Sequence, residues 1–221
     1  MLRVALTFDV EHPDRPTRDG VTQDIVEVLA AADVRATMFL QGRWVRAYPS
    51  VARQIAEAGH LIGNHSHFHA RMPMLTARAL ASDVLTATST IRDVVGVDPR
   101  PWFRCPFGAI DPGTKTLAGL ARLGYRNVGW HVDSRDWASR SPTGVARRIV
   151  DGVKAHGDGA IVLMHGWPWT TAAALPAVIK ELRAFGADFV AIDQLAELPM
   201  RAGWDTGAVL SVWAPPARRA S

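Results

Sequence analysis

Residues 3–11 read RVALTFDVE, an apolar run typical of a buried β-strand that ends in two acidic side chains. In an extended chain residues i and i+2 face the same side, so Asp9 and Glu11 are expected to share one face. A solvated strand end is the simplest alternative, but this strand is apolar and carries both carboxylates to one place. The stretch therefore predicts a buried strand that delivers two acidic groups to a site at its end.

The rest of the chain alternates similar runs with amphipathic helical patterns. Strands are expected at residues 3–8, 36–40, 61–63, 101–103, 127–132, 160–164 and 189–192. Helices are expected at residues 22–32, 50–59, 76–96, 115–123, 143–155 and 173–185, with Ser50 capping the second. This alternation indicates parallel βαβ units, which form either an open doubly wound sheet or a closed barrel.

Polar residues follow several of these strands, which favours the barrel. Asp9 ends the first strand and His65 follows the third. Arg104 and Asp133 follow the fourth and fifth, and His165 ends the sixth. Polar side chains at the carboxyl ends of many strands are typical of a (β/α) barrel, whereas an open sheet concentrates its site at one switch point. We therefore expect an α/β fold, a barrel of about seven parallel strands whose carboxyl-end mouth holds the site.

Length and composition suit one domain with a sizeable core, because 221 residues carry 48% hydrophobic and 21% charged side chains. The net charge of +4 and pI of about 9.8 are compatible with a nucleic-acid partner, but the arginines are scattered and no nucleic-acid-binding motif occurs in the sequence. A solvated basic surface is the better explanation.

Neither a signal peptide nor an apolar run of about 20 residues, as a membrane helix requires, is present in the sequence. A cytoplasmic protein without a membrane partner is therefore expected. The oligomeric state is not predicted.

His65 and His69 are four residues apart, a spacing that would place both imidazoles on one face of a helical turn. They are candidate ligands of one zinc ion, although such pairs also occur as surface residues. Glu11 would complete a His, His, carboxylate set, and Asp9 would act as general base. His67, between the two histidines, is expected to point elsewhere.

Arg104 lies between Pro101 and Pro106, where its cation would pair with Asp9 and keep that carboxylate ionised. A surface arginine at a strand end is the alternative. The backbone N–H of Phe107 would then face a developing oxyanion. Cys105 lacks an evident base and is not expected to be a nucleophile; as the single cysteine it also excludes an intramolecular disulfide.

His165 ends a buried run and would protonate a leaving amine, unless it is simply a hydrogen-bonded core histidine. Either Asp133 or Asp136 could hold its tautomer and keep its pKa high. Leu163 would line an apolar pocket for a methyl group, and the turn at Asp193 is expected to join the site.

Eight tryptophans against two tyrosines is an unusual ratio. Trp137, Trp167 and Trp169 fall in the expected mouth loops, where flat rings could stack on sugars. Core packing explains most of the others.

Taken in order, these pieces resemble the NodB-homology polysaccharide deacetylases, carbohydrate esterase family 4, over residues 6–198. The matching pieces are TFD (7–9), GNHSHFH (63–69), RCPFG (104–108), DSRDW (133–137) and IVLMH (161–165). The resemblance implies a deacetylase domain at residues 1–200. Residues 201–221, which are rich in Ala, Arg and Pro, are expected to form a partly disordered extension. The resemblance also implies a distorted barrel of fewer than eight strands and a divalent ion, Zn²⁺ or another such as Co²⁺.

The implied reaction is removal of N-acetyl groups from chitin-type or peptidoglycan-type sugars. Asp9 would be the base and His65 and His69 metal ligands. Arg104 would orient Asp9, and His165 would be the acid, tuned by an aspartate of its neighbouring motif.

One position departs from the family pattern. A second aspartate usually follows the base as a metal ligand, and here that position is Val10. Glu11 fits an Asp-x-acid variant, which is associated with members acting on small cyclic amides or imides. Hydrolysis of a small non-sugar amide is therefore one alternative function. A carbohydrate-binding pseudoenzyme that lost its metal with Val10 is another.

Overall fold

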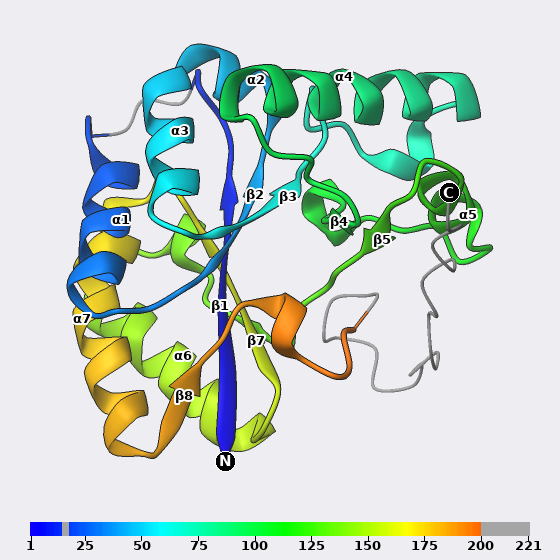
Figure 1. Cartoon of the computed structure of the whole chain (residues 1–221). Helices are drawn as coiled ribbons and strands as arrows, with labels where there is room; N and C mark the ends of the chain where they lie inside the picture. Colours follow the sequence, from blue (N-terminus) through cyan, green and yellow to red (C-terminus); the bar gives the residue numbers. More distant parts are fainter. Residues whose placement is uncertain (15–17, 200–221) are drawn as a thin grey trace, which may run out of the picture.

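The structure, a computed structural model, describes residues 1–14 and 18–199, and the expected extension at 201–221 lies outside them. A parallel sheet curls around an interior, in the order β5-β4-β3-β2-β1-β7-β6, with β8 beside β1 (Figure 1). The distorted barrel expected from the sequence is therefore confirmed. The strands are β1 (Leu2–Val10), β2 (Thr37–Leu40), β3 (Leu61–Asn64), β4 (Trp102–Phe103), β5 (Arg126–Asn127), β6 (Val132–Asp133), β7 (Ala160–His165) and β8 (Ala187–Phe189).

Helices pack on the outside of this sheet, and Figure 1 shows α1, α6 and α7 together on one side of β1 and β7. Apolar side chains of these helices and of the strands form the largest core cluster. Hydrophobic burial between the two layers therefore holds the helices on the sheet. The helices are α1 (Val21–Ala31), α2 (Gly42–Ala47), α3 (Pro49–Glu57), α4 (Ala77–Val95), α5 (Lys115–Arg122), α6 (Pro142–His156) and α7 (Trp169–Ala184).

Strand β1 lies in the middle of the sheet and shows a strict alternation of faces. Leu6, Phe8 and Val10 belong to the cluster shared with the helices. Ala5 belongs to a second cluster, which fills the barrel interior with side chains such as Phe39. Because side chains alternate along a strand, residues 7, 9 and 11 also face the interior. The expectation that Asp9 and Glu11 share a face is confirmed.

The expected strand at 127–132 is wrong as a single element, because its two ends belong to opposite ends of the sheet. At its start, Val128 N–H donates to the carbonyl of Phe103 in β4, at 2.7 Å. At its end, His131 N–H donates to the carbonyl of Ile161 in β7, at 2.9 Å. Only the short strands β5 and β6 form in this part of the chain. Because they lie at opposite ends of the sheet, the short connection between them links the two ends of the barrel.

Three local expectations differ from the structure. Helix α3 begins at Pro49, which occupies its first turn, so Ser50 lies inside the helix and does not cap it. The short helix α2 was not expected. The last strand begins at Ala187, before the expected 189–192, and a 3₁₀ turn (Ile192–Gln194) follows it.

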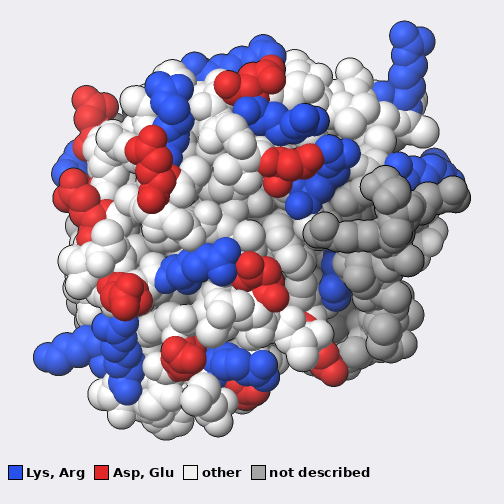
Figure 2. Space-filling view, viewed as in Figure 1, with Lys and Arg blue, Asp and Glu red and all other residues white. Residues whose placement is uncertain are grey.

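Within the described ranges, no helix combines the length and apolar character needed to cross a membrane. On the face shown in Figure 2, basic and acidic side chains are interspersed. This arrangement agrees with a solvated charged surface.

Candidate active site

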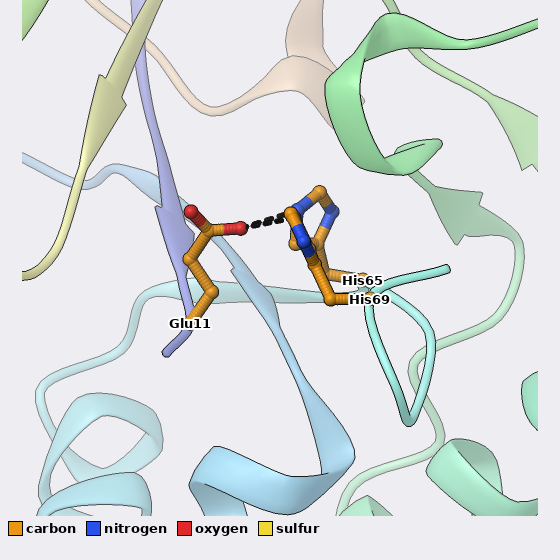
Figure 3. Close-up of side chains that lie close together, drawn as sticks. All are labelled: Glu11, His65 and His69. Carbon is orange, nitrogen blue, oxygen red and sulfur yellow. Dashed lines mark hydrogen bonds and ion pairs between the residues drawn. The ribbon is translucent and has the colours of Figure 1, made fainter. Parts of the chain in front are cut away.

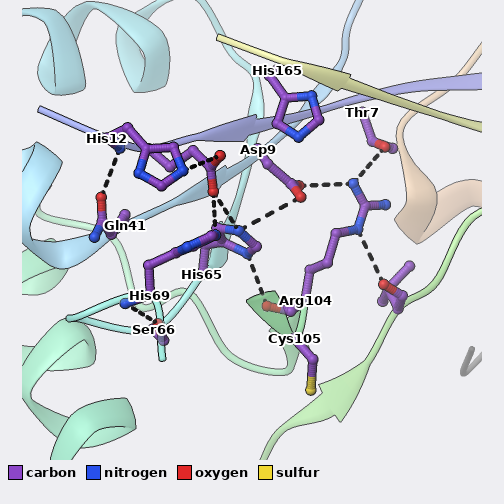
Figure 4. A network of polar contacts seen from close by, with 12 residues as sticks. Thr7, Asp9, His12, Gln41, His65, Ser66, His69, Arg104, Cys105 and His165 are labelled. Atoms are coloured by element: carbon purple, nitrogen blue, oxygen red, sulfur yellow. Dashed lines mark hydrogen bonds and ion pairs between the residues drawn. The ribbon is translucent and has the colours of Figure 1, made fainter. Parts of the chain in front are cut away.

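The candidate site lies at the carboxyl ends of the strands, where β1, β3, β4 and β7 bring their polar residues together (Figure 4). Asp9 is in register with His165 on the neighbouring strand β7. His65 directly follows β3, and Arg104 directly follows β4. Four chain segments thus supply one cluster, as expected from their places in the sequence.

Glu11, His65 and His69 converge on one point, and Figure 3 shows both imidazoles turned toward the carboxylate. Glu11 Oε2 lies 3.1 Å from His65 Nε2 and also contacts His69 Nε2. Each residue offers one possible metal-ligand atom, and these three atoms all lie within 4.8 Å of one another. The three residues predicted as metal ligands are therefore brought together.

The two histidines come from a loop and not from the helical turn that their spacing suggested. Ser66 and His69 have positive φ angles of 64° and 57°, which no helix allows. Side chains hold this loop: Asn64 accepts from Ser66 N–H at 2.7 Å, and Ser66 Oγ accepts from His69 N–H at 3.0 Å. His67 points away, with its backbone N–H bonded to Asp83.

The hydrogen bonding of His65 shows that this cluster suits a cation. Its Nδ1 lies 2.9 Å from the carbonyl oxygen of Arg104, which only accepts, so Nδ1 carries the proton. In the neutral ring the lone pair on Nε2 then faces Glu11 Oε2, and two acceptors in contact need a positive charge between them. Without an ion, a proton on Nε2 of His65 provides this charge: burial would lower the pKa of His65, but Asp9 and Glu11 outweigh burial and raise it. One divalent ion satisfies all three groups, and two nitrogens with one carboxylate are a donor set that zinc accepts.

The Glu11 carboxylate is strongly held in its charged form. Burial by itself would raise the pKa of Glu11, but hydrogen bonds from three neighbouring imidazoles, the first of them His12, outweigh burial. The pKa of Glu11 consequently lies well below its ordinary value.

Val10 does not face the site. Because β1 continues through this residue, its side chain points outward into the helix-facing core and is fully buried. An aspartate there would have to leave the strand geometry to reach His65. In this chain the next inward position is Glu11, and its longer side chain reaches the imidazoles.

Asp9 is paired with Arg104, as predicted. Asp9 Oδ1 accepts from Arg104 Nη1 at 3.0 Å, and the guanidinium is completely buried. Thr7 Oγ1 accepts from the same nitrogen at 2.8 Å. The carbonyls of Val128 and Gly129, in the connection between β5 and β6, each accept from Arg104 at 3.1 Å. That connection therefore also fixes the cation that orients Asp9.

His165 is held by Asp136, which settles which aspartate contacts it. Nδ1 of His165 lies 2.7 Å from Asp136 Oδ1, while Asp136 Oδ2 accepts from Thr171 Oγ1 at 2.6 Å. Asp133 instead accepts from the backbone N–H of Arg135 at 2.9 Å. Burial would lower the pKa of His165, but the charge of Asp136 and the hydrogen bond to it raise that pKa to about 9.

The residues predicted to contact substrate lie around this cluster. Phe107 is 55% exposed, and its ring centroid lies 4.5 Å from that of His69. Trp137, which follows Asp136, is 54% exposed. Trp167 is half-buried, and Leu163 is a buried residue on the interior side of β7. The exposed rings of Phe107 and Trp137 are therefore accessible to a ligand.

Two predictions about neighbouring residues have clear outcomes. Asp193 does not join the site: it pairs with Arg35 at 3.2 Å, and the adjacent Ile192 bonds to Thr37, at the opposite end of β2. The Cys105 thiol is buried, which raises its pKa, so the geometry gives no support for a nucleophile.

Sequence reasoning missed His12 and Gln41. His12 Nε2 contacts Glu11 Oε1 at 2.9 Å, and the backbone N–H of His12 donates to Gln41 Oε1 at 2.9 Å. A histidine directly after a candidate ligand was the available signal, but only the turn after β1 brings its ring back to Glu11.

Comparison with known proteins places this arrangement in a family. The family model described as polysaccharide deacetylase matches residues 2–128. The chain is 33% identical over 193 residues to the peptidoglycan-N-acetylglucosamine deacetylase PgdA of Listeria monocytogenes, covering 87% of this chain and 38% of that protein. It therefore spans well under half of that relative.

A second relative is matched over most of its length. The chitooligosaccharide deacetylase of Azorhizobium caulinodans is 31% identical over 197 residues, with coverage of 83% of this chain and 89% of that protein. Among solved structures, a carbohydrate esterase family 4 pseudoenzyme from Bacillus anthracis superimposes with a TM-score of 0.78 at 28% identity, covering 87% of this chain and 64% of the other. This chain therefore belongs to the polysaccharide deacetylase family, the NodB-homology domains of carbohydrate esterase family 4.

Proposed function

We propose that this protein is a divalent-metal-dependent deacetylase that removes N-acetyl groups from amino sugars of the peptidoglycan or chitooligosaccharide type. The observation that carries the proposal is the pair of acidic side chains at the end of β1, Asp9 within the strand and Glu11 directly after it. Glu11 belongs to a three-residue donor set, and Asp9 lies beside that set, with its Oδ2 3.6 Å from His65 Nε2. The names of the two relatives supply the substrate class.

Glu11, His65 and His69 would hold the ion, with zinc or cobalt as the candidates. When bound, the ion would supply the positive charge that acidifies a water molecule and polarises the amide carbonyl. Asp9 would accept the proton of the attacking water, because its pairing with Arg104 holds its carboxylate turned toward the site. The Phe107 backbone N–H is the candidate donor to the oxygen that becomes negative.

On the other side of the site, His165 would protonate the departing amine. Asp136 accepts a hydrogen bond from Nδ1–H of His165, so the second ring nitrogen is left for the substrate. Trp137 and Trp167 would present flat faces to a sugar ring.

The test is acetate release from N-acetylglucosamine oligomers by the protein with added Zn²⁺, with an EDTA-treated sample as control. We expect release that disappears with EDTA and returns with the metal. No release from a protein that demonstrably carries its metal would overturn the sugar substrate and direct the search to small amides or cyclic imides.

A metal-free binding protein is the second candidate, because the chain also resembles a pseudoenzyme of the family. Metal analysis of the purified protein separates the two. A protein that binds no zinc would favour the pseudoenzyme, whereas zinc held by Glu11 and the two histidines would exclude it.

A further inference from the structure

We infer that His12 is a positioning residue that fixes the carboxylate of Glu11 as a one-oxygen ligand for the metal. This inference rests on the metal site proposed above. It concerns the residue directly after Glu11, the proposed ligand that lies two positions after Asp9, whereas the usual family ligand directly follows the base.

The two oxygens of Glu11 have separate partners. Oε2 faces the imidazoles of His65 and His69, and Oε1 contacts Nε2 of His12 at 2.9 Å. His12 does not belong to the set of donor atoms that lie within 4.8 Å of one another. The geometry therefore makes His12 a partner of the ligand and not a fourth ligand.

His12 is itself held in place. Its φ of 60° turns the chain back after β1, a conformation that non-glycine residues rarely adopt. Its backbone N–H donates at 2.9 Å to Oε1 of Gln41, a buried side chain whose amide also donates to the carbonyl of His67 at 3.3 Å. The His12 ring packs edge-on against His69, with centroids 4.6 Å apart. Figure 4 shows this chain of contacts from Gln41 through His12 to the cluster.

The flexibility of the Glu11 side chain explains why a hydrogen bond from His12 would matter. Glu11 lies beyond the last residue of β1 and has one more rotatable bond than aspartate, so more conformations are lost when it binds a metal. A hydrogen bond to the second oxygen selects one of these conformations before the ion arrives. Outer partners of this kind are typically worth about 10- to 100-fold in metal affinity.

The experiment is a double-mutant cycle on Zn²⁺ affinity, measured by competition with a chromophoric chelator. The four proteins are the parent, His12→Phe, Glu11→Ala and the double variant; the two remaining histidines should keep weak zinc binding measurable without Glu11. Phenylalanine keeps the ring contact and the backbone strain but removes the donor. We expect His12→Phe to weaken binding by about 10- to 100-fold in the parent and to have almost no effect in the Glu11→Ala background.

His12→Gln is the conservative variant, because its amide can donate to the same oxygen, and it should recover part of the loss. His156→Phe is the matched control, since it removes an exposed imidazole at the end of α6, and it should bind zinc as the parent does. The melting temperature of each metal-free variant separates lost structure from lost affinity.

Equal losses in the two backgrounds would overturn the inference, since His12 would then act independently of Glu11. Unchanged affinity of His12→Phe while the parent binds zinc would overturn it as well, and would leave the proposed function intact. A parent that binds no zinc would instead overturn the proposed function, and this inference with it.

Discussion

The two sides of the site use the same pair of side chains, a carboxylate and an imidazole, in opposite ways. On the β1–β3 side, Glu11 contacts Nε2 of His65, and Nδ1–H of His65 donates a hydrogen bond to the backbone carbonyl of Arg104. On the β7 side, Asp136 accepts a hydrogen bond from Nδ1–H of His165. In the first arrangement the carboxylate faces Nε2, where a proton or a metal ion provides the positive charge, whereas in the second the carboxylate holds Nδ1 and leaves Nε2 for a substrate. In the proposed function, the nitrogen that contacts the carboxylate thus distinguishes the metal-ligand histidine from the histidine that acts as acid.

The largest effect is expected from removing the metal-side carboxylate. Glu11→Ala should lose more Zn²⁺ affinity than the roughly 100-fold upper range for an outer partner, because it removes a ligand atom. Asp9→Asn should keep its zinc and lose about 10²- to 10⁴-fold in kcat, because only the base is lost. Chelator competition and acetate release on both variants check this, and Glu11→Ala binding zinc as tightly as the parent would show the ligand assignment to be wrong.

The next effect concerns the acid side. His165→Phe should lower kcat for acetate release by about 10²- to 10⁴-fold while zinc affinity stays near that of the parent. If this variant instead loses its zinc, His165 belongs to the metal side and the contrast between the two sides fails. Zinc analysis and single-turnover kinetics on the same sample distinguish the two results.

A pH profile sharpens the contrast. The pKa of His165 is raised to about 9, so the ring is protonated at neutral pH and activity should fall as pH rises through about 9. The same raised pKa stabilises the folded protein fully below pH 6.5, and this stabilisation is lost as pH rises from 6.5 to about 9. Asp136→Asn removes the charge that raises the pKa, so the basic limb should move to lower pH. If the basic limb stays at the same pH in Asp136→Asn, a group other than His165 is responsible for it.

The smallest effects are expected at the exposed rings. Trp137→Ala, on the acid side, should raise KM by about 2- to 10-fold with little change in kcat, the size of one aromatic contact. Phe107 lies against His69, so Phe107→Ala tests in the same way the side of the site that holds Glu11. Steady-state kinetics on chitooligosaccharides of increasing length would show which ring contacts the sugar, and an unchanged KM in both variants would exclude both.

Much of this site could be predicted from the strand ends alone. The alternation of β1 places Asp9 and Glu11 inward, and both Arg104 and His165 lie where the barrel mouth requires them. The conformation of the His65–His69 loop could not be predicted, because it depends on positive φ angles and on a contact with Asp83 from helix α4. The order of the motifs predicted the residues correctly, but not their backbone.

The division of the expected strand at 127–132 shows the same limit. Its sequence is a β-rich run, and Gly129 in its middle is the local residue that could have indicated a break. The break arises because Val128 bonds to β4 and His131 bonds to β7, at the two ends of the curled sheet. Pairing over such distances overrides local preference, and only the three-dimensional structure reveals it.

Strand β1 has a consequence for how the protein is made. Strand β2 pairs with the last residues of β1, but the two other partners of β1 come much later in the chain: β7 begins at Ala160, and β8, which pairs with the first residues of β1, begins at Ala187. At a translation rate of about 5–20 residues per second, β1 would leave the ribosome well before either partner exists. Contacts so distant along the chain form slowly. The edge of β1 that faces β7 thus stays unpaired in a nascent chain until β7 has been translated, so Asp9 has its neighbour in β2 long before it has its neighbour His165.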